Sequence, residues 1–167
     1  MPKDSQNVSL DALIPREAFE VQGEQSQNIG RNIPMISIRD LEINSFFYSY
    51  LRKPDFQRET NECDVQKICE FIETFLDGDL IPAIILWRSS SSYYFVIDGS
   101  HRLSSSIAWI NDDYGDGKIS KEFYDGDITD EQKAAAQKLR KLIKDNIGSY
   151  RTHLTSLQPW TKVLTPL

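Results

Sequence analysis

The chain has 167 residues, which is enough for one domain with a substantial core and too few for two ordinary domains. Hydrophobic residues make up 40% of it and charged residues 26%, as in globular proteins, and no apolar run approaches the length of a membrane span. The net charge of −6 argues against a broad, sequence-independent grip on nucleic acid, but it is compatible with a local basic patch.

The N-terminal part of the chain is predicted to begin with a polar segment, followed by a strand and an aromatic segment. Residues 1–32 are expected to form a polar N-terminal segment with a short helix or turn at 10–13. Apolar and polar residues then alternate over 33–38, which predicts a strand. The aromatic residues at 46–50 favour a segment that packs in the core over a platform for stacking bases.

Two helices and a hairpin are predicted from local signals. An apolar stripe over 64–77, with Asp64 as N-cap and Gly78 as the stop, predicts a helix. Strands at 83–88 and 93–97 are separated by a run of serines and predict a β-hairpin. Residues 103–110 read as a helix that follows this hairpin.

A last helix is expected from 131 to 147, after a capping-box pattern at Thr129 to Gln132. Helices and strands in this order predict an α/β (α+β) domain over residues 33–150, followed by a C-terminal tail over 151–167. The polar start of the chain and the poor disulfide spacing of its two cysteines, which fit no metal motif, predict a cytoplasmic protein with reduced thiols.

The turn Asp98–Gly99–Ser100–His101–Arg102 lies between the second hairpin strand and the helix after it. The first N–H groups of a helix have no partner inside the helix and attract anions. Gly99 allows a ligand to approach the backbone closely, and His101 and Arg102 add charge-assisted donors. This arrangement favours a phosphate site; the alternative is a structural turn in which Asp98 caps the helix.

These residues also carry a family resemblance. The run from Ile97 to Leu103 resembles the Asp-Gly-Gln-His-Arg signature of the ParB/sulfiredoxin-like superfamily. Pro54–Asp55–Phe56–Gln57–Arg58 resembles a Gln-Arg segment of its restriction-type members, and 80–86 resembles a proline-led entry into an inner strand. The resemblance covers about residues 33–115. It implies a small mixed sheet flanked by helices.

The resemblance also implies an activity, namely Mg²⁺-dependent hydrolysis of a nucleoside triphosphate in bacterial DNA modification or anti-phage restriction. The backbone amides of Ser100 and His101 would hold phosphate oxygens behind Gly99, and Arg102 would pair with them. His101 would donate to the transferring phosphoryl group, and Asp98 would orient water or the metal.

Two further residues complete the nucleotide site that the resemblance implies. Arg58 is expected to act as a second cationic clamp, and Gln57 to bond a base, a sugar or water. Asp112 and Asp113 lie in a loop rich in carboxylates and glycine, which does not fit an EF-hand but gives two weaker candidates for holding Mg²⁺. Ser100 stands where sulfiredoxins have their catalytic cysteine, so sulfinate reduction is not expected.

Two other functions stay open at this point. The first is a non-enzymatic DNA-binding or transcription-regulatory module, in which the turn grips a DNA phosphate and the basic stretch 133–151 assists. The second and weaker one is a small-molecule kinase with Asp40 or Glu42 as its base. A solvated helix face is the simpler interpretation of the basic stretch.

Overall fold

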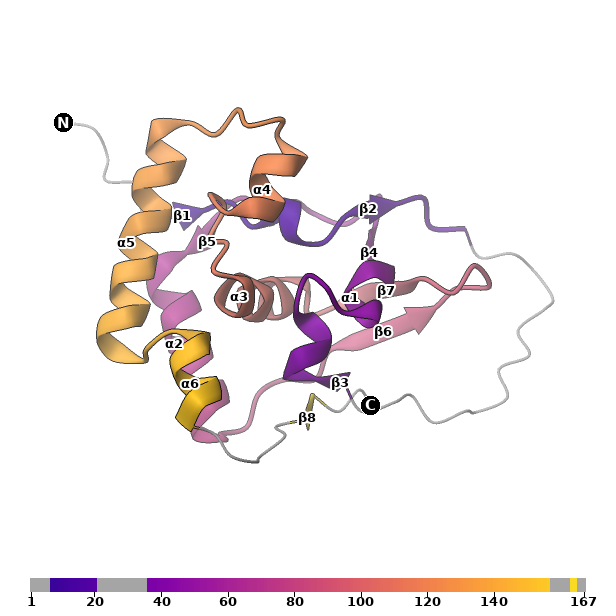
Figure 1. The fold of residues 1–167 in the computed structure, drawn as a ribbon. Coiled ribbons are helices and arrows are strands. Elements are labelled where there is room, and N and C mark those ends of the chain that lie inside the picture. Colours follow the sequence, from indigo (N-terminus) through magenta and orange to yellow (C-terminus); the bar gives the residue numbers. More distant parts are fainter. Residues whose placement is uncertain (1–6, 21–35, 157–162, 165–167) are drawn as a thin grey trace.

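The computed structural model describes residues 7–20, 36–156 and 163–164 (Figure 1). The α-helices are α1 (Phe46–Tyr50), α2 (Val65–Asp77), α3 (Ser100–Asn111), α4 (Lys118–Phe123), α5 (Asp130–Asn146) and α6 (Tyr150–Ser156). The strands are β1 (Asn7–Val8), β2 (Arg16–Glu17), β3 (Ile36–Ser37), β4 (Leu51–Pro54), β5 (Cys63–Asp64), β6 (Ile85–Arg88), β7 (Tyr94–Asp98) and β8 (Val163–Leu164). Two 3₁₀ helices, η1 (Asp11–Leu13) and η2 (Ile38–Leu41), complete the fold.

The main sheet has four strands in the order β2-β4-β7-β6. β4 pairs in parallel with both β2 and β7, whereas β6 and β7 form the predicted antiparallel hairpin. β1 with β5 and β3 with β8 form separate two-stranded pairs. The sheet is therefore small and mixed, and the predicted α+β class is confirmed.

One strand is placed differently from the expectation. The segment 80–86 was expected to enter an inner strand, but β6 lies at the edge of the four-stranded sheet. The inner position beside β7 is taken by β4, whose four residues are too short for a clear alternating pattern.

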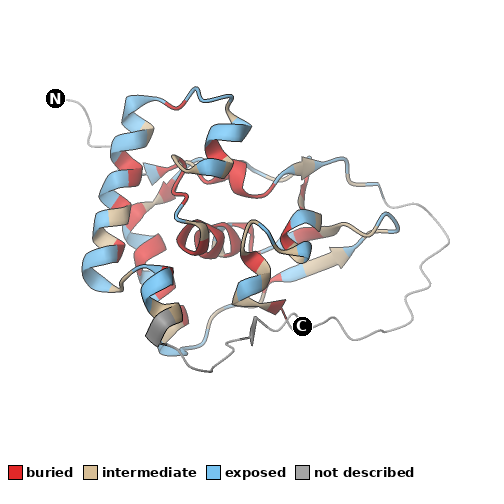
Figure 2. Ribbon diagram, in the orientation of Figure 1, coloured by how far each residue is buried: buried red, intermediate tan, exposed pale blue. Residues whose placement is uncertain are grey.

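Helix α3 lies at the centre of the core (Figures 1 and 2). Leu103, Ile107 and Ala108 on this helix are buried. The helix contacts α2 and α6 as well as both 3₁₀ helices. Because α3 starts directly after β7, the core holds the turn between them in place from one side.

The caps of α2 and α5 confirm their predicted boundaries. The Asp64 carboxylate accepts a hydrogen bond from the Lys67 amide (3.0 Å), and Gly78 ends α2 with φ +79°. Thr129 and Gln132 form the capping box that begins α5. None of the helices in the described residues is long and apolar enough to cross a membrane.

Two parts of the chain outside the expected central domain also pack into its core. Val8, Leu10 and Leu13, from the segment expected to be polar, are buried in the same cluster as α3. At the other end, Tyr150 of α6 packs its ring against Trp109 at a centroid distance of 5.3 Å. Of the strand predicted over 33–38, residues 36–37 form β3, 38 begins η2, and 33–35 lie outside the described residues.

Candidate phosphate-binding turn

The turn between β7 and α3 depends on glycine at position 99. Gly99 has φ +93°, and a Cβ there would lie 2.9 Å from Cγ1 of Ile84 and 3.3 Å from its Cα. Both the left-handed backbone and the close approach of Ile84 exclude a side chain. The backbone carbonyl of Gly99 accepts the first helical bond, from Leu103 N (2.9 Å).

The N-terminus of α3 has no side-chain cap within the described residues. Gly99 occupies the N-cap position, so Asp98 does not serve as the helix cap that the structural alternative required. The amides of Ser100, His101 and Arg102 open the helix at the positive end of its dipole. An anion bound at this turn would meet donors that no carboxylate already satisfies.

Arg102 folds back over the turn. Its Nη2 donates to the carbonyl of Ala83 (2.8 Å) and to Oδ2 of Asp98 (3.0 Å). Its Nε is buried and has no hydrogen-bond partner in the described residues. The Asp98 side chain is 63% exposed, so the pair lies at the surface with an unsatisfied donor behind it.

Gln57 reaches the strand that leads into the turn. Its Nε2 donates to the carbonyls of Val96 (3.0 Å) and Ile97 (3.2 Å), while its Oε1 is buried without a partner in the described part of the chain. Gln57 therefore ties the segment after β4 to the end of β7. Arg58 follows it in an exposed position.

His101 contacts a buried polar network that no sequence motif indicated. Its Nδ1 lies 3.5 Å from Sγ of Cys63. Close to both lies Lys53, which is fully buried and donates from Nζ to Oδ1 of Asp11 (2.7 Å) and to Oγ1 of Thr60 (3.2 Å). The Asp11 carboxylate also pairs with Arg16 at its outer edge. No spacing in the sequence links Asp11 to a lysine on β4.

This network controls protonation around His101. Burial lowers the pKa of His101, and the positive charges of Lys53 and Arg102 lower it further. Burial raises the pKa of Cys63 to about 11, so this residue is a thiol at neutral pH. Although burial opposes ionisation of Asp11, hydrogen bonds from Arg16 and Lys53 hold its pKa well below the ordinary value. His101 is therefore uncharged at neutral pH.

Asp112 and Asp113 do not come near the turn. They follow the last residue of α3, and twelve helical residues separate them from Gly99, which corresponds to about 18 Å at a rise of ~1.5 Å per residue. Asp113 is buried and accepts hydrogen bonds from the amides of Gly115, Gly117 and Ser120. Asp113 therefore organises the loop before α4. The described residues contain no cluster of three side chains that could hold a metal ion.

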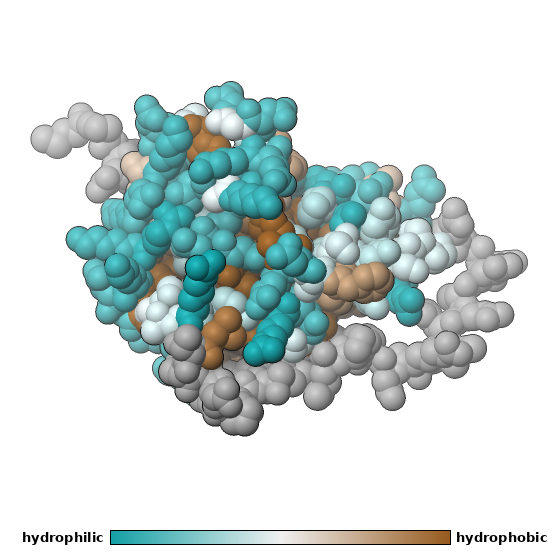
Figure 3. All heavy atoms as spheres, viewed as in Figure 1, coloured by the Kyte–Doolittle hydropathy of each residue, from teal (hydrophilic) through white to brown (hydrophobic). Residues whose placement is uncertain are grey.

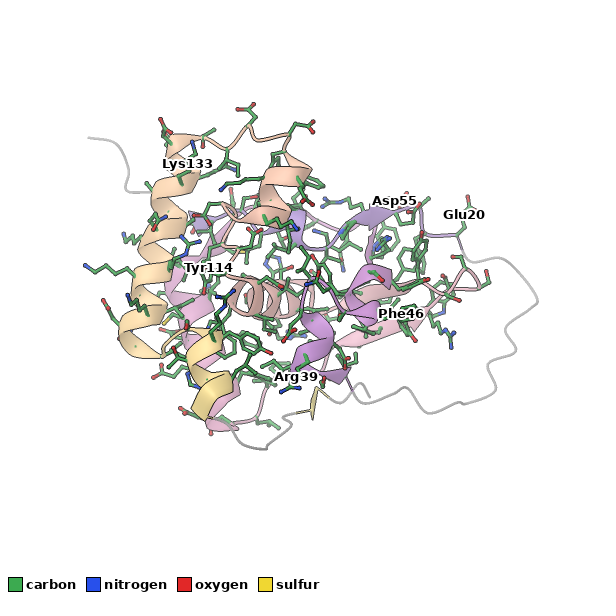
Figure 4. All side chains as sticks on the ribbon, in the orientation of Figure 1. Glu20, Arg39, Phe46, Asp55, Tyr114 and Lys133 are labelled. Atoms are coloured by element: carbon green, nitrogen blue, oxygen red, sulfur yellow. The ribbon has the colours of Figure 1, made fainter. Side chains whose placement is uncertain are left out.

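The basic stretch 133–151 is partly neutralised. Arg140 forms ion pairs with Asp112 (2.8 Å) and Asp116 (2.7 Å). Lys133, which Figure 4 labels, pairs with Asp130 (3.3 Å). The two Arg140 pairs attach α5 to the loop after α3, whereas the Lys133 pair lies within α5. They leave fewer cations for a DNA backbone than the sequence suggested.

The two candidate bases of the kinase alternative also have structural contacts. The Asp40 carboxylate accepts a hydrogen bond from the Ser37 amide (2.6 Å). Glu42 accepts one from the hydroxyl of Tyr150 (2.8 Å). Both carboxylates therefore hold elements together.

Comparison with known proteins identifies a protein family. A family model described as the N-terminal domain of the GmrSD restriction endonuclease matches residues 38–163. The matched range includes β7, the turn and α3, and it starts after β1, η1 and β2. Searches among curated proteins and among solved structures find no match.

Proposed function

Because this chain belongs to the family of the GmrSD restriction endonuclease N-terminal domain, we propose that it binds and hydrolyses a nucleoside triphosphate in DNA restriction or modification. The Asp-Gly-Ser-His-Arg turn supports a second and more distant relationship, to the ParB/sulfiredoxin-like superfamily. The observation that carries the proposal is the uncapped N-terminus of α3 behind Gly99, with an arginine folded over it.

Binding would proceed by exchange of one anion for another. In the free protein the Arg102 guanidinium is held by the Asp98 carboxylate and the Ala83 carbonyl. A phosphate at the turn takes the place of that carboxylate and accepts hydrogen bonds from Arg102 and from the amides of Ser100 and His101. Asp98 is thereby released to orient a water molecule.

The exposed carboxylate of Asp98 also fits a role in holding Mg²⁺. This ion keeps several waters and binds proteins through one or two carboxylates together with substrate phosphates. When bound, Mg²⁺ would neutralise charge on the phosphate oxygens. The described residues offer it no dedicated cage, so the nucleotide itself would supply most of the other ligands.

His101 would act as a neutral donor. With Nδ1 directed at Cys63, its Nε2 is left for the transferring phosphoryl group. A donor that strengthens its bond as charge develops lowers the barrier more than one that binds the ground state equally well.

The test is equilibrium binding of ATP, GTP, CTP and ADP with Mg²⁺, measured beside phosphate release. Arg102→Ala removes a charged, bidentate contact worth roughly 1.5–3 kcal/mol, so nucleotide affinity should fall about ten- to a hundredfold. Arg151→Ala, an exposed arginine on α6, is the control and should bind as the wild type does. Unchanged affinity in a folded Arg102→Ala protein would rule out the phosphate site.

The non-enzymatic alternative predicts a different result. A regulatory module whose turn grips a DNA phosphate would bind DNA with a steep dependence on salt and would release no phosphate from any nucleotide. Residues 133–151 would assist through their exposed lysines.

A further inference from the structure

The loop that joins α2 to β6 lies against the phosphate-binding turn. It follows Gly78 at the end of α2, spans residues 79–84 and leads into β6 (Figure 1). We call this segment the α2–β6 loop. Its last residue, Ile84, is buried, and the Cα and Cγ1 atoms of Ile84 occupy the space that a side chain on Gly99 would need. The loop and the turn are therefore in direct contact.

Few hydrogen bonds hold this loop in place. The amide of Asp79 donates to the carbonyl of Thr74 (3.2 Å), but residues 80–82 make no hydrogen bond within the part of the chain that the structure describes. The register of β6 against β7 shifts between Ile85 and Leu86, directly after the loop. The regular ladder of the sheet thus ends before it reaches the loop.

Arg102 supplies the hydrogen bond that joins the loop to the turn. Its Nη2 donates to the carbonyl of Ala83 (2.8 Å), which lies 19 positions earlier in the chain, and to Oδ2 of Asp98 (3.0 Å). The same nitrogen lies 3.1 Å from the position that a Cβ on Gly99 would take. One guanidinium nitrogen therefore connects the loop, the turn and the carboxylate that a phosphate would replace.

The two acceptors of Arg102 differ in what a bound phosphate does to them. The Asp98 side chain is 63% exposed, so its pairing with Arg102 competes with water. The Ala83 carbonyl uses the other hydrogen of Nη2, and a phosphate does not have to displace it. The loop itself is open to solvent: Leu80 is 98% exposed, although the face drawn in Figure 3 is mainly hydrophilic.

A phosphate at the turn would tighten the hold of Arg102 on the loop. Pairs between arginine and phosphate are strong and frequently bidentate, so the guanidinium would lose much of its freedom. The carbonyl of Ala83 would then accept from a fixed donor, and the loop would be more ordered. A coupling of this kind is reciprocal, because whatever orders the loop raises the affinity for phosphate by the same factor.

We propose that Arg102 couples the α2–β6 loop to the phosphate-binding turn, so that a bound nucleotide orders the loop and an ordered loop strengthens nucleotide binding. This inference rests on the proposed function, because it concerns the regulation of the same site. It gives a role in that regulation to a segment that the sequence indicated only as the entry into a strand.

The first test follows the mobility of a nitroxide label on Leu80→Cys. The new thiol is exposed, whereas Cys63 and Cys69 are buried and burial raises the pKa of both thiols. Spectra of the full chain are recorded with and without ATP, GTP, CTP or ADP, each with Mg²⁺, beside equilibrium binding of the same nucleotide. The sharp component of mobile labels should shrink when a nucleotide binds. A label on Phe123→Cys, half-exposed on α4, is the control and should not respond.

Arg102→Ala tests the connection without any nucleotide. The carbonyl of Ala83 loses its donor, so the label at position 80 should become more mobile than in the protein that keeps Arg102. Arg88→Ala removes an exposed arginine at the other end of β6 and is the matched control. It should leave the spectrum of the label unchanged.

The reciprocal effect is measured as nucleotide affinity. Ala83→Gly adds backbone freedom to the free loop, and a nucleotide that orders the loop must remove this freedom. Affinity should therefore fall about two- to fivefold. Ser90→Gly adds similar freedom to the exposed loop between β6 and β7, and it should bind nucleotide as the wild type does.

Each measurement has a result that would overturn the coupling. These results are a nucleotide that binds without changing the label at position 80, an equal response of the label at position 123, an unchanged label in Arg102→Ala, and equal affinities of the two glycine variants. A wild type that binds none of the four nucleotides contradicts the proposed function together with the coupling. Binding without a response of the loop contradicts the coupling alone.

Discussion

The sulfur of Cys63 lies 3.5 Å from Nδ1 of His101, at the point where β5 meets the start of α3. Cys63 is buried, with its thiol also 3.4 Å from the carbonyl of Thr60, while the His101 ring extends towards solvent. A small buried side chain thus holds one edge of an exposed imidazole. This contact explains how the imidazole ring of a histidine at the N-terminus of a helix can keep one orientation.

The first prediction concerns this contact. Cys63→Ala removes the sulfur beside Nδ1, so the ring gains freedom and nucleotide turnover should fall several-fold, with little change in affinity. Cys69→Ala is the control: Cys69 is equally buried but lies on α2 beside Asn146, away from the turn. Both variants should lose about 1–2 kcal/mol of unfolding free energy from the smaller side chain. Equal turnover in the two variants would show that Cys63 only fills the core.

The second prediction is a dependence of stability on pH. Burial and the charges of Lys53 and Arg102 hold the pKa of His101 below its ordinary value of 6.5. The unfolded chain therefore binds a proton at His101 more readily than the folded one, and the free energy of unfolding falls as the pH drops below about 7. His101→Gln should remove this part of the slope in urea unfolding curves between pH 7 and 5. The lowered pKa of Asp11 acts in a separate window, below about pH 4, and should stay unchanged in that variant.

The third prediction concerns Gly99. Gly99→Ala and Gly126→Ala both place a side chain on a left-handed backbone, at φ +93° and +81°, which costs about 1–2 kcal/mol. A Cβ at position 126 meets nothing within 4 Å, whereas one at position 99 collides with Ile84. Overpacking there should add about 1–3 kcal/mol to the loss in unfolding free energy. Denaturant unfolding of both variants therefore measures the cost of the contact between the new Cβ and Ile84. Equal losses of unfolding free energy in the two variants would show that Ile84 moves aside at no cost in stability.

Local signals explain what could be predicted from the sequence. The boundaries of α2 and α5 follow from caps and an apolar stripe that all lie within one helix. The hairpin and the turn after it are likewise continuous in the chain. The helix after this turn could be anticipated in the same way, but the sequence left open whether Asp98 caps it, and only the structure shows Gly99 at the N-cap.

Contacts between distant segments could not be predicted in this way. β2 has two residues, too few for any alternation, and it pairs with β4. Lys53 of β4 forms a buried ion pair with Asp11, which lies 42 positions away in the chain. The exposure of Phe46 follows from the orientation of a five-residue helix on the sheet. Asp113 carries the same charge as its neighbour Asp112, and only the loop geometry shows that one is buried and the other faces Arg140.

The last prediction separates hydrolysis from binding. Amide donors and Arg102 are sufficient to hold a triphosphate. Cleavage also needs a group that orients the attacking water and a donor whose hydrogen bond strengthens as negative charge develops in the transition state. Asp98→Asn keeps the size of the side chain and removes its charge. His101→Ala removes the donor and leaves the amides and Arg102 in place. Both variants should keep much of their nucleotide affinity and lose turnover by about 10²-fold or more.

The structure adds a difference between these two variants. Asp98→Asn also removes the carboxylate that competes for Arg102 in the free protein (3.0 Å), so nucleotide binding should be slightly tighter in it than in His101→Ala. The measurement is phosphate release beside equilibrium binding for the wild type and both variants, with Arg151→Ala as the control. A wild type that binds nucleotide but releases no phosphate, with or without DNA, would contradict hydrolysis and favour the regulatory module.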